Sequence, residues 1–425
     1  MIRKALLRKI FDAACMQRWN DKLRVVELTE LDKQAHKMMI AYVLGKHQEK
    51  DQAINWIDII EGGIFELLHR SVLTDIKPQI FRTIKENHSD EYKKLKQWVL
   101  EDELQPLLGK LWDTHGFKEK FTAHFENDNN TIEKKILTSA HFYATEWEIK
   151  KVINPFNQNG DDEIITRQDS DKEKINSFNL KGTSDLNGNP GSNISKFVNI
   201  CGTLRFQLRW AHIHRMPRTS VLGHLLFVAI IAYLGSLDLK ICNKGCFNNF
   251  FTGLFHDLPE VLTRDIISPV KRSIPTLEKI IKTQEQKQMN EKILPLLTDI
   301  DENEMRMFTG IIETSNGDTI GEFDNSIFEN GNYQKKDDVN GKYNKDTHAP
   351  RNGQLVKAAD QLAAFIEASV AIENGCASRE LHAALYKLKP KSEKQLHGEQ
   401  EKIHKEKPFP NEILDIIDPL FADFA

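Results

Sequence analysis

Long apolar segments with helical spacing run through most of this chain of 425 residues. Their apolar residues recur three and four positions apart, which gathers them on one face of a helix. Runs that alternate apolar and polar residues, as half-buried strands do, are scarce. The chain is therefore predicted to be all-α. Helices are expected over residues 35–45, 52–68, 133–152, 221–234, 249–263, 277–297 and 355–373.

Two polar stretches interrupt this pattern. Residues 157–194 are rich in Asn, Asp, Gly, Ser and Lys, which predicts an interdomain linker or a mobile loop. Residues 315–352 contain repeated Asn-Gly pairs and predict a polar insertion between two helices, outside the core. Because the chain is longer than one domain of common size, we predict a first domain over 1–156 and a second over 195–425.

Composition narrows the class of protein. The net charge of −4 is small and gives no electrostatic reason to expect nucleic acid or an anionic membrane as a partner. The five cysteines are scattered, which favours reduced thiols in the cytoplasm over a disulfide framework. No apolar run is expected to span a bilayer, and charged residues within 1–15 favour a first core helix over a cleaved signal peptide.

Three blocks of the first half recur in the same order in the second half. The paired blocks are 18–36 and 209–224, 63–76 and 253–266, and 137–141 and 356–360. We prefer duplication over chance similarity as the explanation, which gives two tandem helical domains. The first copy has Glu66-Leu67 where the second has His-Asp, so it is predicted to be a degenerate structural or regulatory domain. The alternative is an improvised site built from His36, Glu66, His69 and His141.

Two histidines and two aspartates on three predicted helices of the second half could converge on one metal ion. His224 opens one apolar helix, His256 and Asp257 are adjacent in the next, and Asp360 follows two alanines in a third. An aspartate in such an apolar run is costly to bury unless it is paired or bound to a cation. This ligand set suits Mn, Fe, Co, Ni or Zn better than calcium, and the lack of further inward histidines favours a single divalent ion.

Residues after the His-Asp pair extend this hypothesis. Glu260 stands three positions after Asp257 and four after His256, on the same face of a continuous helix, where it suits a general acid or base. The proline before it predicts a kink or an early turn. Thr263 and Asp265 could contact a sugar hydroxyl or orient water, and a helix cap or a surface position is the equal alternative.

Arg209 and Trp210 form the second notable pair. A guanidinium can hold phosphate oxygens in a bidentate manner, and an indole can pack against a sugar or a base. Core packing is the alternative for Trp210. Arg215 and Arg218 add positive charge between this pair and His224.

Residues 209–373 resemble the HD superfamily of metal-dependent phosphohydrolases and, within it, bacterial HD-type 5′-deoxynucleotidases. The pattern of that family is Arg-Trp, then a histidine, then His-Asp-x-x-Glu-Val-Leu-Thr-x-Asp, then Pro-Val-Lys and a Lys-x-x-Asp helix. The matching residues are 209–210, 224, 256–265, 269–271 and 357–360. Leu222-Gly223 departs from it, because the family tends to have polar residues before its first histidine.

The resemblance implies an all-helical HD domain with one divalent transition metal, and it implies roles for individual residues. Glu260 would transfer the proton and Arg209 would hold the phosphate. Trp210 and Asp265 would contact or crowd the sugar and favour deoxyribose. The family often dimerises, which implies a homodimer. The implied metal ligands are His224, His256, Asp257 and Asp360.

The predicted function is therefore a metal-dependent phosphohydrolase that releases phosphate from (deoxy)nucleoside 5′-monophosphates. Its partner would be a small nucleotide, with no nucleic acid and no membrane. One alternative within the hydrolases is an HD phosphodiesterase or a nucleoside triphosphate hydrolase. An alternative from another class is a nucleotide-sensing protein without catalysis.

Overall fold

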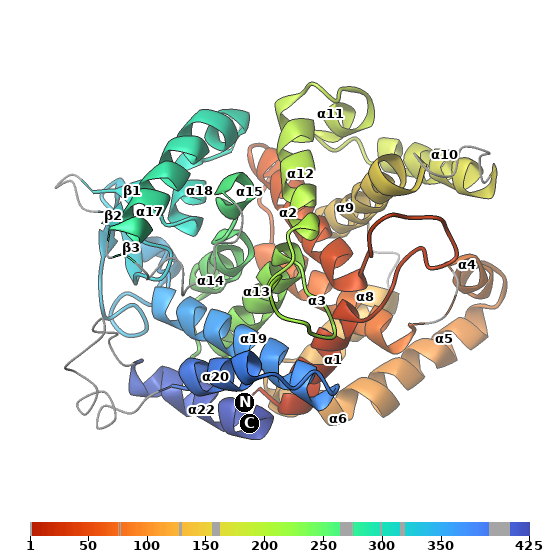
Figure 1. Ribbon diagram of the computed structural model, residues 1–425. Coiled ribbons are helices and arrows are strands. Elements are labelled where there is room, and N and C mark those ends of the chain that lie inside the picture. The colour runs from red at the N-terminus through yellow and green to blue at the C-terminus, as the bar shows by residue number, and fades with distance from the viewer. Residues whose placement is uncertain are drawn as a thin grey trace.

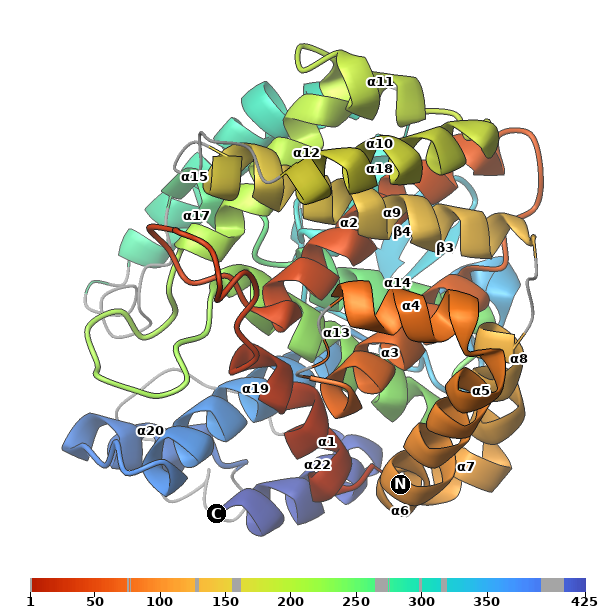
Figure 2. The ribbon, with the colours of Figure 1, turned by 90° about the vertical axis from the view of Figure 1, so that its right-hand side faces the viewer.

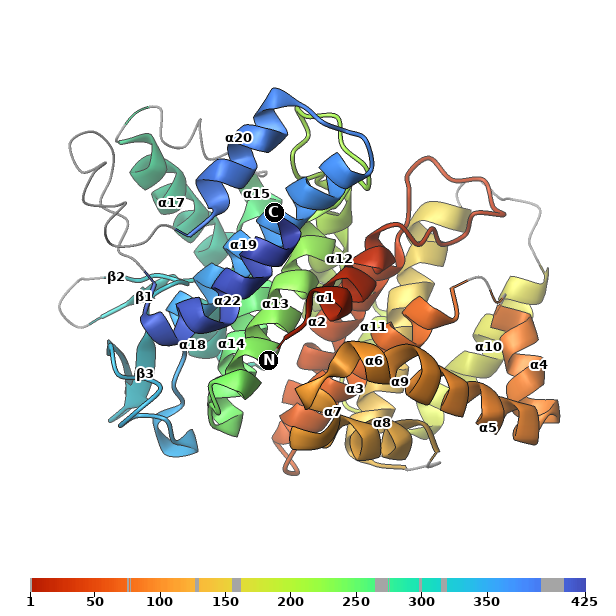
Figure 3. The same ribbon diagram turned by 90° about the horizontal axis from the view of Figure 1, so that it is seen from below.

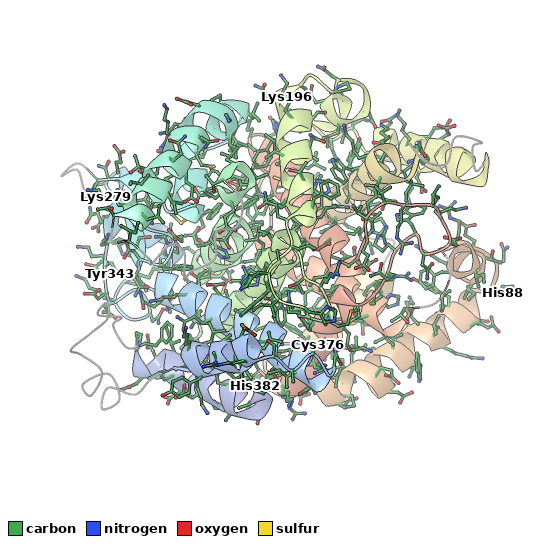
Figure 4. The ribbon with its side chains drawn as sticks, viewed as in Figure 1. His88, Lys196, Lys279, Tyr343, Cys376 and His382 are labelled. Carbon is green, nitrogen blue, oxygen red and sulfur yellow. The ribbon has the colours of Figure 1, made fainter. Side chains whose placement is uncertain are left out.

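The computed structural model describes residues 2–74, 76, 78–126, 130–154, 162–263, 274, 276–297, 300–314, 319–390 and 409–425. Helices dominate these residues, and the strands are short, so the prediction of an all-α chain is confirmed. Figure 1 shows the first half (red to yellow) beside the second half (green to blue). His88 marks the outer edge of the first half, and Lys279 and Tyr343 mark the opposite edge (Figure 4).

The described helices divide between the two halves of the chain. In the first half they are α1 (Lys4–Phe11), α2 (Glu30–Glu49), α3 (Trp56–Val72), α4 (Pro78–Asn87), α5 (Ser89–Trp98), α6 (Gln105–Leu108), α7 (Lys110–Thr114), α8 (Phe117–Glu126), α9 (Ile132–Glu148), α10 (Asp162–Ser177) and α11 (Thr183–Gly188). In the second half they are α12 (Asn193–Thr203), α13 (Val221–Asp238), α14 (Asn243–Phe255), α15 (Glu260–Thr263), α17 (Leu277–Gln288), α18 (Glu302–Phe308), α19 (Gly353–Glu373), α20 (Arg379–Leu388) and α22 (Asn411–Phe424).

Helix α13 lies at the centre of the fold. It packs against α14 and α19 on one side and against α2 on the other, an arrangement visible in Figures 1 and 3. By length and composition it is apolar enough to cross a membrane, which the sequence did not lead us to expect, but 89% of that window is buried within the protein. A helix that is apolar all round needs such neighbours, so α13 is a core helix.

The two helices that meet at the centre begin in the same way. Thr29 caps α2 by accepting a hydrogen bond from the Asp32 amide, and Ser220 caps α13 by accepting one from the Gly223 amide. The Ser220 hydroxyl also donates to the Asp32 carboxylate at 2.6 Å. The N-termini of α2 and α13 are therefore joined directly.

A loop of the same construction precedes each of these helices. A single bridge closes it, between Gln17 and Thr29 in the first half and between Leu208 and Ser220 in the second. The tryptophan of the Arg-Trp pair has a positive φ in both loops, 55° in the first and 56° in the second. The two Arg-Trp pairs thus occupy equivalent backbone positions.

Residues 157–194 are more regular than the sequence suggested. The sequence predicted an interdomain linker or a mobile loop; where the structure describes this segment, it forms α10, α11 and the start of α12. Helix α10 lies alongside α9 (Figure 2). Ile175 and Leu180 are buried, which shows that a few apolar side chains are enough to dock this polar segment.

The predicted insertion also differs from the expectation. It contains two antiparallel hairpins, β1–β2 and β3–β4, and residues 315–318 of it lie outside the description. Ile320 and Ile327 are fully buried, and the buried Arg351 guanidinium donates to the carbonyls of Gly321 and Asp324 at 2.6 and 2.8 Å. The insertion is therefore tied into the core and does not lie outside it. The strands are β1 (Ile312–Glu313), β2 (Thr319–Ile320), β3 (Ser326–Glu329) and β4 (Asn332–Lys335).

The first and last described helices pack together. The Lys4 ammonium donates to the Asp423 carbonyl at 2.6 Å and lies over the Phe424 ring. Helix α1 buries four apolar side chains, which confirms the prediction of a core helix near the N-terminus. They are Leu6, Leu7, Ile10 and Phe11.

Candidate metal centre

Three elements of the second half bring the four predicted metal ligands together. His224 lies in the first turn of α13, Asp360 lies in α19, and His256 and Asp257 follow the last residue of α14. A Cβ atom on Gly253 would lie 2.7 Å from the Cα of Ala229 in α13. Only glycine therefore allows α14 to approach α13 this closely, and this contact sets the position of His256 three residues later.

Three of these side chains cluster together, and the fourth contacts one of them. His224, His256 and Asp257 each offer a ligand atom that lies within 4.8 Å of those of the other two. Oδ1 of Asp360 lies 2.9 Å from Nε2 of His224. Both imidazoles are buried, whereas the side chains of Asp257 and Asp360 are 25% and 28% exposed. The cluster is thus open on its carboxylate side, where a substrate could enter.

The hydrogen bonding of His256 fixes which nitrogen faces the cluster. Its Nδ1 lies 2.9 Å from the carbonyl oxygen of Gly253, which can only accept, so Nδ1 carries the proton. Its Nε2 is buried and forms no hydrogen bond with any described residue. A buried nitrogen lone pair 3.3 Å from the Asp257 carboxylate is the arrangement that a metal ligand requires.

His224 is oriented by a carboxylate that we did not predict. Nδ1 of His224 lies 3.3 Å from Oε1 of Glu367. Because a carboxylate oxygen can only accept a hydrogen bond, Nδ1 carries the proton. The other ring nitrogen, Nε2, faces Asp360. Glu367 is fully buried on α19. Carboxylates that hold the second nitrogen of a metal-binding histidine are common supporting groups. The signal was present in the sequence, since this glutamate interrupts an apolar run two helical turns after Asp360.

The Arg-Trp pair contacts this glutamate. Nε1 of Trp210 donates to Oε2 of Glu367 at 2.7 Å, and Nε of Arg209 donates to the same oxygen at 3.2 Å. The prediction assigned Arg209 to a phosphate and Trp210 to a sugar. Instead, these contacts hold the carboxylate that orients His224, and a role toward substrate remains a prediction.

Charge in the cluster favours a cation. Burial alone would lower the pKa of His256, but the neighbouring Asp257 carboxylate and Asp360 raise it to about 9. Burial alone would raise the pKa of Glu367, yet Arg209 and His224 hold it well below its usual value. The Asp257 and Asp360 carboxylates thus stabilise positive charge on His256, and the same negative charge would attract a divalent ion. The donor set of imidazole nitrogen and carboxylate oxygen therefore fits a transition metal.

Comparison with known families agrees with this geometry. Residues 201–389 match the family model of the HD domain. The match supports membership of the HD superfamily and indicates a metal-dependent phosphohydrolase in general terms. It includes all four predicted ligands and Glu367. No curated protein matches the chain.

Glu260 of the HD domain is held beside the ligands by the main chain. Helix α14 ends at Phe255, and four turn residues precede α15, so the break expected from the proline is present. Asp257 and Glu260 therefore do not share one continuous helix, contrary to the prediction. The Glu260 amide donates to the Asp257 carbonyl at 3.0 Å, and the Glu260 side chain is buried.

The remaining predicted site residues have different outcomes. The Thr263 hydroxyl donates to the Glu285 carboxylate of α17 at 3.0 Å, so it joins two helices of the HD domain. Asp265 lies outside the described residues. Phe323 of the insertion places its ring 5.7 Å from the ring of His256. The insertion therefore contributes to the surroundings of the metal ligands, in line with the expectation that so long an insertion could cover or reshape the pocket.

The first half places a lysine where the HD domain has its first histidine. Lys33 stands four residues after the cap of α2, as His224 stands four residues after the cap of α13. The Lys33 ammonium lies 2.5 Å from Nδ1 of His141. His36 points elsewhere, with its Nε2 at 2.9 Å from the Val198 carbonyl. The predicted pairing of His36 with His224 is therefore wrong, and His36 does not join His141.

Proposed function

We propose that the protein hydrolyses phosphomonoesters, with (deoxy)nucleoside 5′-monophosphates as substrates. The observation that carries this proposal is the buried Nε2 of His256, which has no hydrogen-bond partner among the described residues and lies beside two carboxylates and a second imidazole, inside a region that matches the HD domain. His224, His256, Asp257 and Asp360 would hold one divalent ion, Mn, Co, Fe, Ni or Zn. When bound, the ion would supply Lewis acidity toward a phosphoryl oxygen and toward water.

Two other side chains have proposed roles in the reaction. Glu260 is buried next to the main chain of Asp257, and it would move a proton between water and the leaving 5′-oxygen. The charge of Arg209 acts on both Asp257 and Asp360, which supports a position close enough to offset developing phosphoryl charge. Its Nε donates to Glu367.

The substrate, location and assembly follow from the resemblance to HD-type 5′-deoxynucleotidases. Trp210, Thr263 and Asp265 are the residues proposed to contact the nucleotide. We propose a cytoplasmic protein that forms a homodimer and acts on small nucleotides, without nucleic acid or membrane partners. The scattered cysteines and small net charge support this choice.

The test is phosphate release from a panel of nucleoside mono-, di- and triphosphates and a cyclic dinucleotide, with Mn²⁺ or Co²⁺. We expect release from deoxynucleoside monophosphates and its loss in Asp257→Asn, while Arg24→Gln in the first half retains full turnover. Products from the cyclic dinucleotide or a triphosphate would indicate the alternative hydrolase classes. Nucleotide binding without turnover would indicate a sensor, and full turnover in Asp257→Asn would refute the proposed site.

We also propose that residues 1–156 are a degenerate copy of the HD domain. The equivalent loops support this, as does Glu148, a fully buried carboxylate that accepts from Arg18 and Trp19 at 3.0 and 2.9 Å. Burial lowers the pKa of Lys33 to about 7. The Lys33 nitrogen contacts His141, and the corresponding contact in the HD domain is the one between His224 and Asp360. A lysine nitrogen in this place would exclude a metal, so elemental analysis should find one metal per chain. Two per chain would contradict the proposal.

A further inference from the structure

The loop of residues 208–218, which precedes α13, surrounds a hollow of about 300 Å³. The loop is closed by the bridge from Leu208 to Ser220, and Asn374 after α19 donates to the Met216 carbonyl at 3.1 Å. Trp210 and Ile213 pack against the buried apolar cluster of α19 and α20. Cys376 and His382 mark this part of the molecule in Figure 4. The hollow is thus supported by rigid helices.

Positive charge dominates the lining of the hollow. Arg209, Arg215 and Arg218 line it together with two histidines, and the loop contains no Asp or Glu. Two carboxylates of neighbouring elements face these groups. Glu367 accepts from Arg209 inside the protein, and the fully exposed Glu380 acts on His212. Within the described part of the chain, three guanidinium groups thus line the hollow, and the buried Glu367 carboxylate contacts one of them.

Arg215 is the decisive residue. Its side chain is buried, with the residue only 2% exposed, and Nη2 donates to the hydroxyl of Thr219. Nη1 is also buried, and it has no hydrogen-bond partner among the described residues. An arginine keeps its charge in proteins, so a buried unsatisfied N–H on it is costly. An anion in the hollow would remove that cost.

The equivalent loop of the first half shows what a satisfied arginine looks like. Arg24 follows its tryptophan by five residues, as Arg215 does. Nη1 of Arg24 donates to the Trp19 carbonyl, and Nη2 donates to Gln17 at 3.1 Å. That loop also contains Asp21 and Glu27. In loops of the same construction, both terminal nitrogens of Arg24 therefore have acceptors, whereas Nη1 of Arg215 has none among the described residues.

We propose that the hollow binds a phosphate group, as an anion site distinct from the four metal ligands. The planar guanidinium matches phosphate oxygens, and the surrounding arginines complete the charge. The phosphate could be free inorganic phosphate or a second phosphate of a nucleotide. Glu367 contacts Arg209 on this side and His224 on the other, so the anion site adjoins the metal centre. The inference does not require the proposed hydrolysis.

The test is calorimetric titration of the full-length protein with inorganic phosphate in the presence of EDTA, which separates this site from any metal-bound phosphate. We expect saturable binding that is weakened about tenfold in Arg215→Gln, the loss of one charge-assisted contact. Arg218→Gln should weaken it several-fold, and Arg24→Gln should leave it unchanged. Tighter binding of a nucleoside 3′,5′-bisphosphate than of the 5′-monophosphate, dependent on Arg215, would identify a nucleotide phosphate as the source. Equal binding of the two would identify free phosphate.

Two results would overturn the proposal. One is the absence of phosphate binding without metal. The other is binding that both Arg215→Gln and Arg218→Gln leave unchanged. Arg218 is exposed, so its variant remains informative if circular dichroism shows that the buried Arg215→Gln variant fails to fold. Failure of nucleotide turnover would leave this binding intact, which keeps the two proposals separate.

Discussion

Replacing Glu367 by glutamine should lower both the metal affinity and the free energy of unfolding, and a matched control variant can distinguish the two effects. One oxygen of Glu367 accepts from His224 and Thr219, and the other accepts from Arg209 and Trp210. Glutamine has almost the same shape but only one accepting oxygen, so two of these four donors would face an NH₂ group. The substitution also removes the charge that pairs with the Arg209 guanidinium.

The contacts set the size of the effect. Removing one partner of a buried ion pair costs about 3–5 kcal/mol, and the contacts that glutamine keeps place Glu367→Gln near the lower end, at about 3 kcal/mol. Loss of a supporting carboxylate behind a metal-binding histidine lowers metal affinity about 10–100-fold. We therefore expect both a less stable protein and a weaker metal site.

The first half supplies a matched control. Glu148 is equally buried and accepts from Arg18, Trp19 and Arg205, but it touches none of the predicted metal ligands. Glu148→Gln should lose a similar free energy of unfolding in urea with EDTA, and it should bind Mn²⁺ in calorimetry as the wild type does. If Glu367→Gln binds Mn²⁺ as tightly as Glu148→Gln, the proposed orientation of His224 is refuted.

Three further predictions concern pH, packing and metal removal. Lys33 has a pKa near 7 in the folded protein and near 10.5 when unfolded, so its unfavourable contribution is complete below pH 7 and fades as pH rises toward 10.5. Lys33→Met should therefore raise the free energy of unfolding in urea by about 3 kcal/mol at pH 7 and by about 1 kcal/mol at pH 9. An equal increase in unfolding free energy at the two pH values would contradict this prediction. Gly253→Ala should cost about 1–3 kcal/mol and weaken Mn²⁺ binding, because its Cβ would meet the Ala229 backbone; unchanged thermal unfolding would exclude this packing argument. EDTA should lower the melting temperature of the metal-loaded wild type but not of His256→Ala, and equal shifts in both would place the metal elsewhere.

The sequence predicted the helices well because their cause is local. Apolar residues at helical spacing mark α13 and α19 wherever they pack. The insertion and the segment 157–194 were harder, because few apolar residues dock them. Arg351 illustrates the reason, since its burial depends on carbonyl groups that only the folded insertion brings within reach.

For the site, the sequence by itself determined which side chains can bind a metal, since ligand chemistry depends on residue type and motif spacing. The tertiary structure decided how those side chains are held. It paired Arg209 with Glu367, turned Nε2 of His256 toward a carboxylate, and placed Lys33, not His36, against His141. Each of these contacts joins atoms from different elements or depends on a local turn. Residue spacing along the chain cannot predict such contacts, because they depend on the angle and the distance at which helices pack.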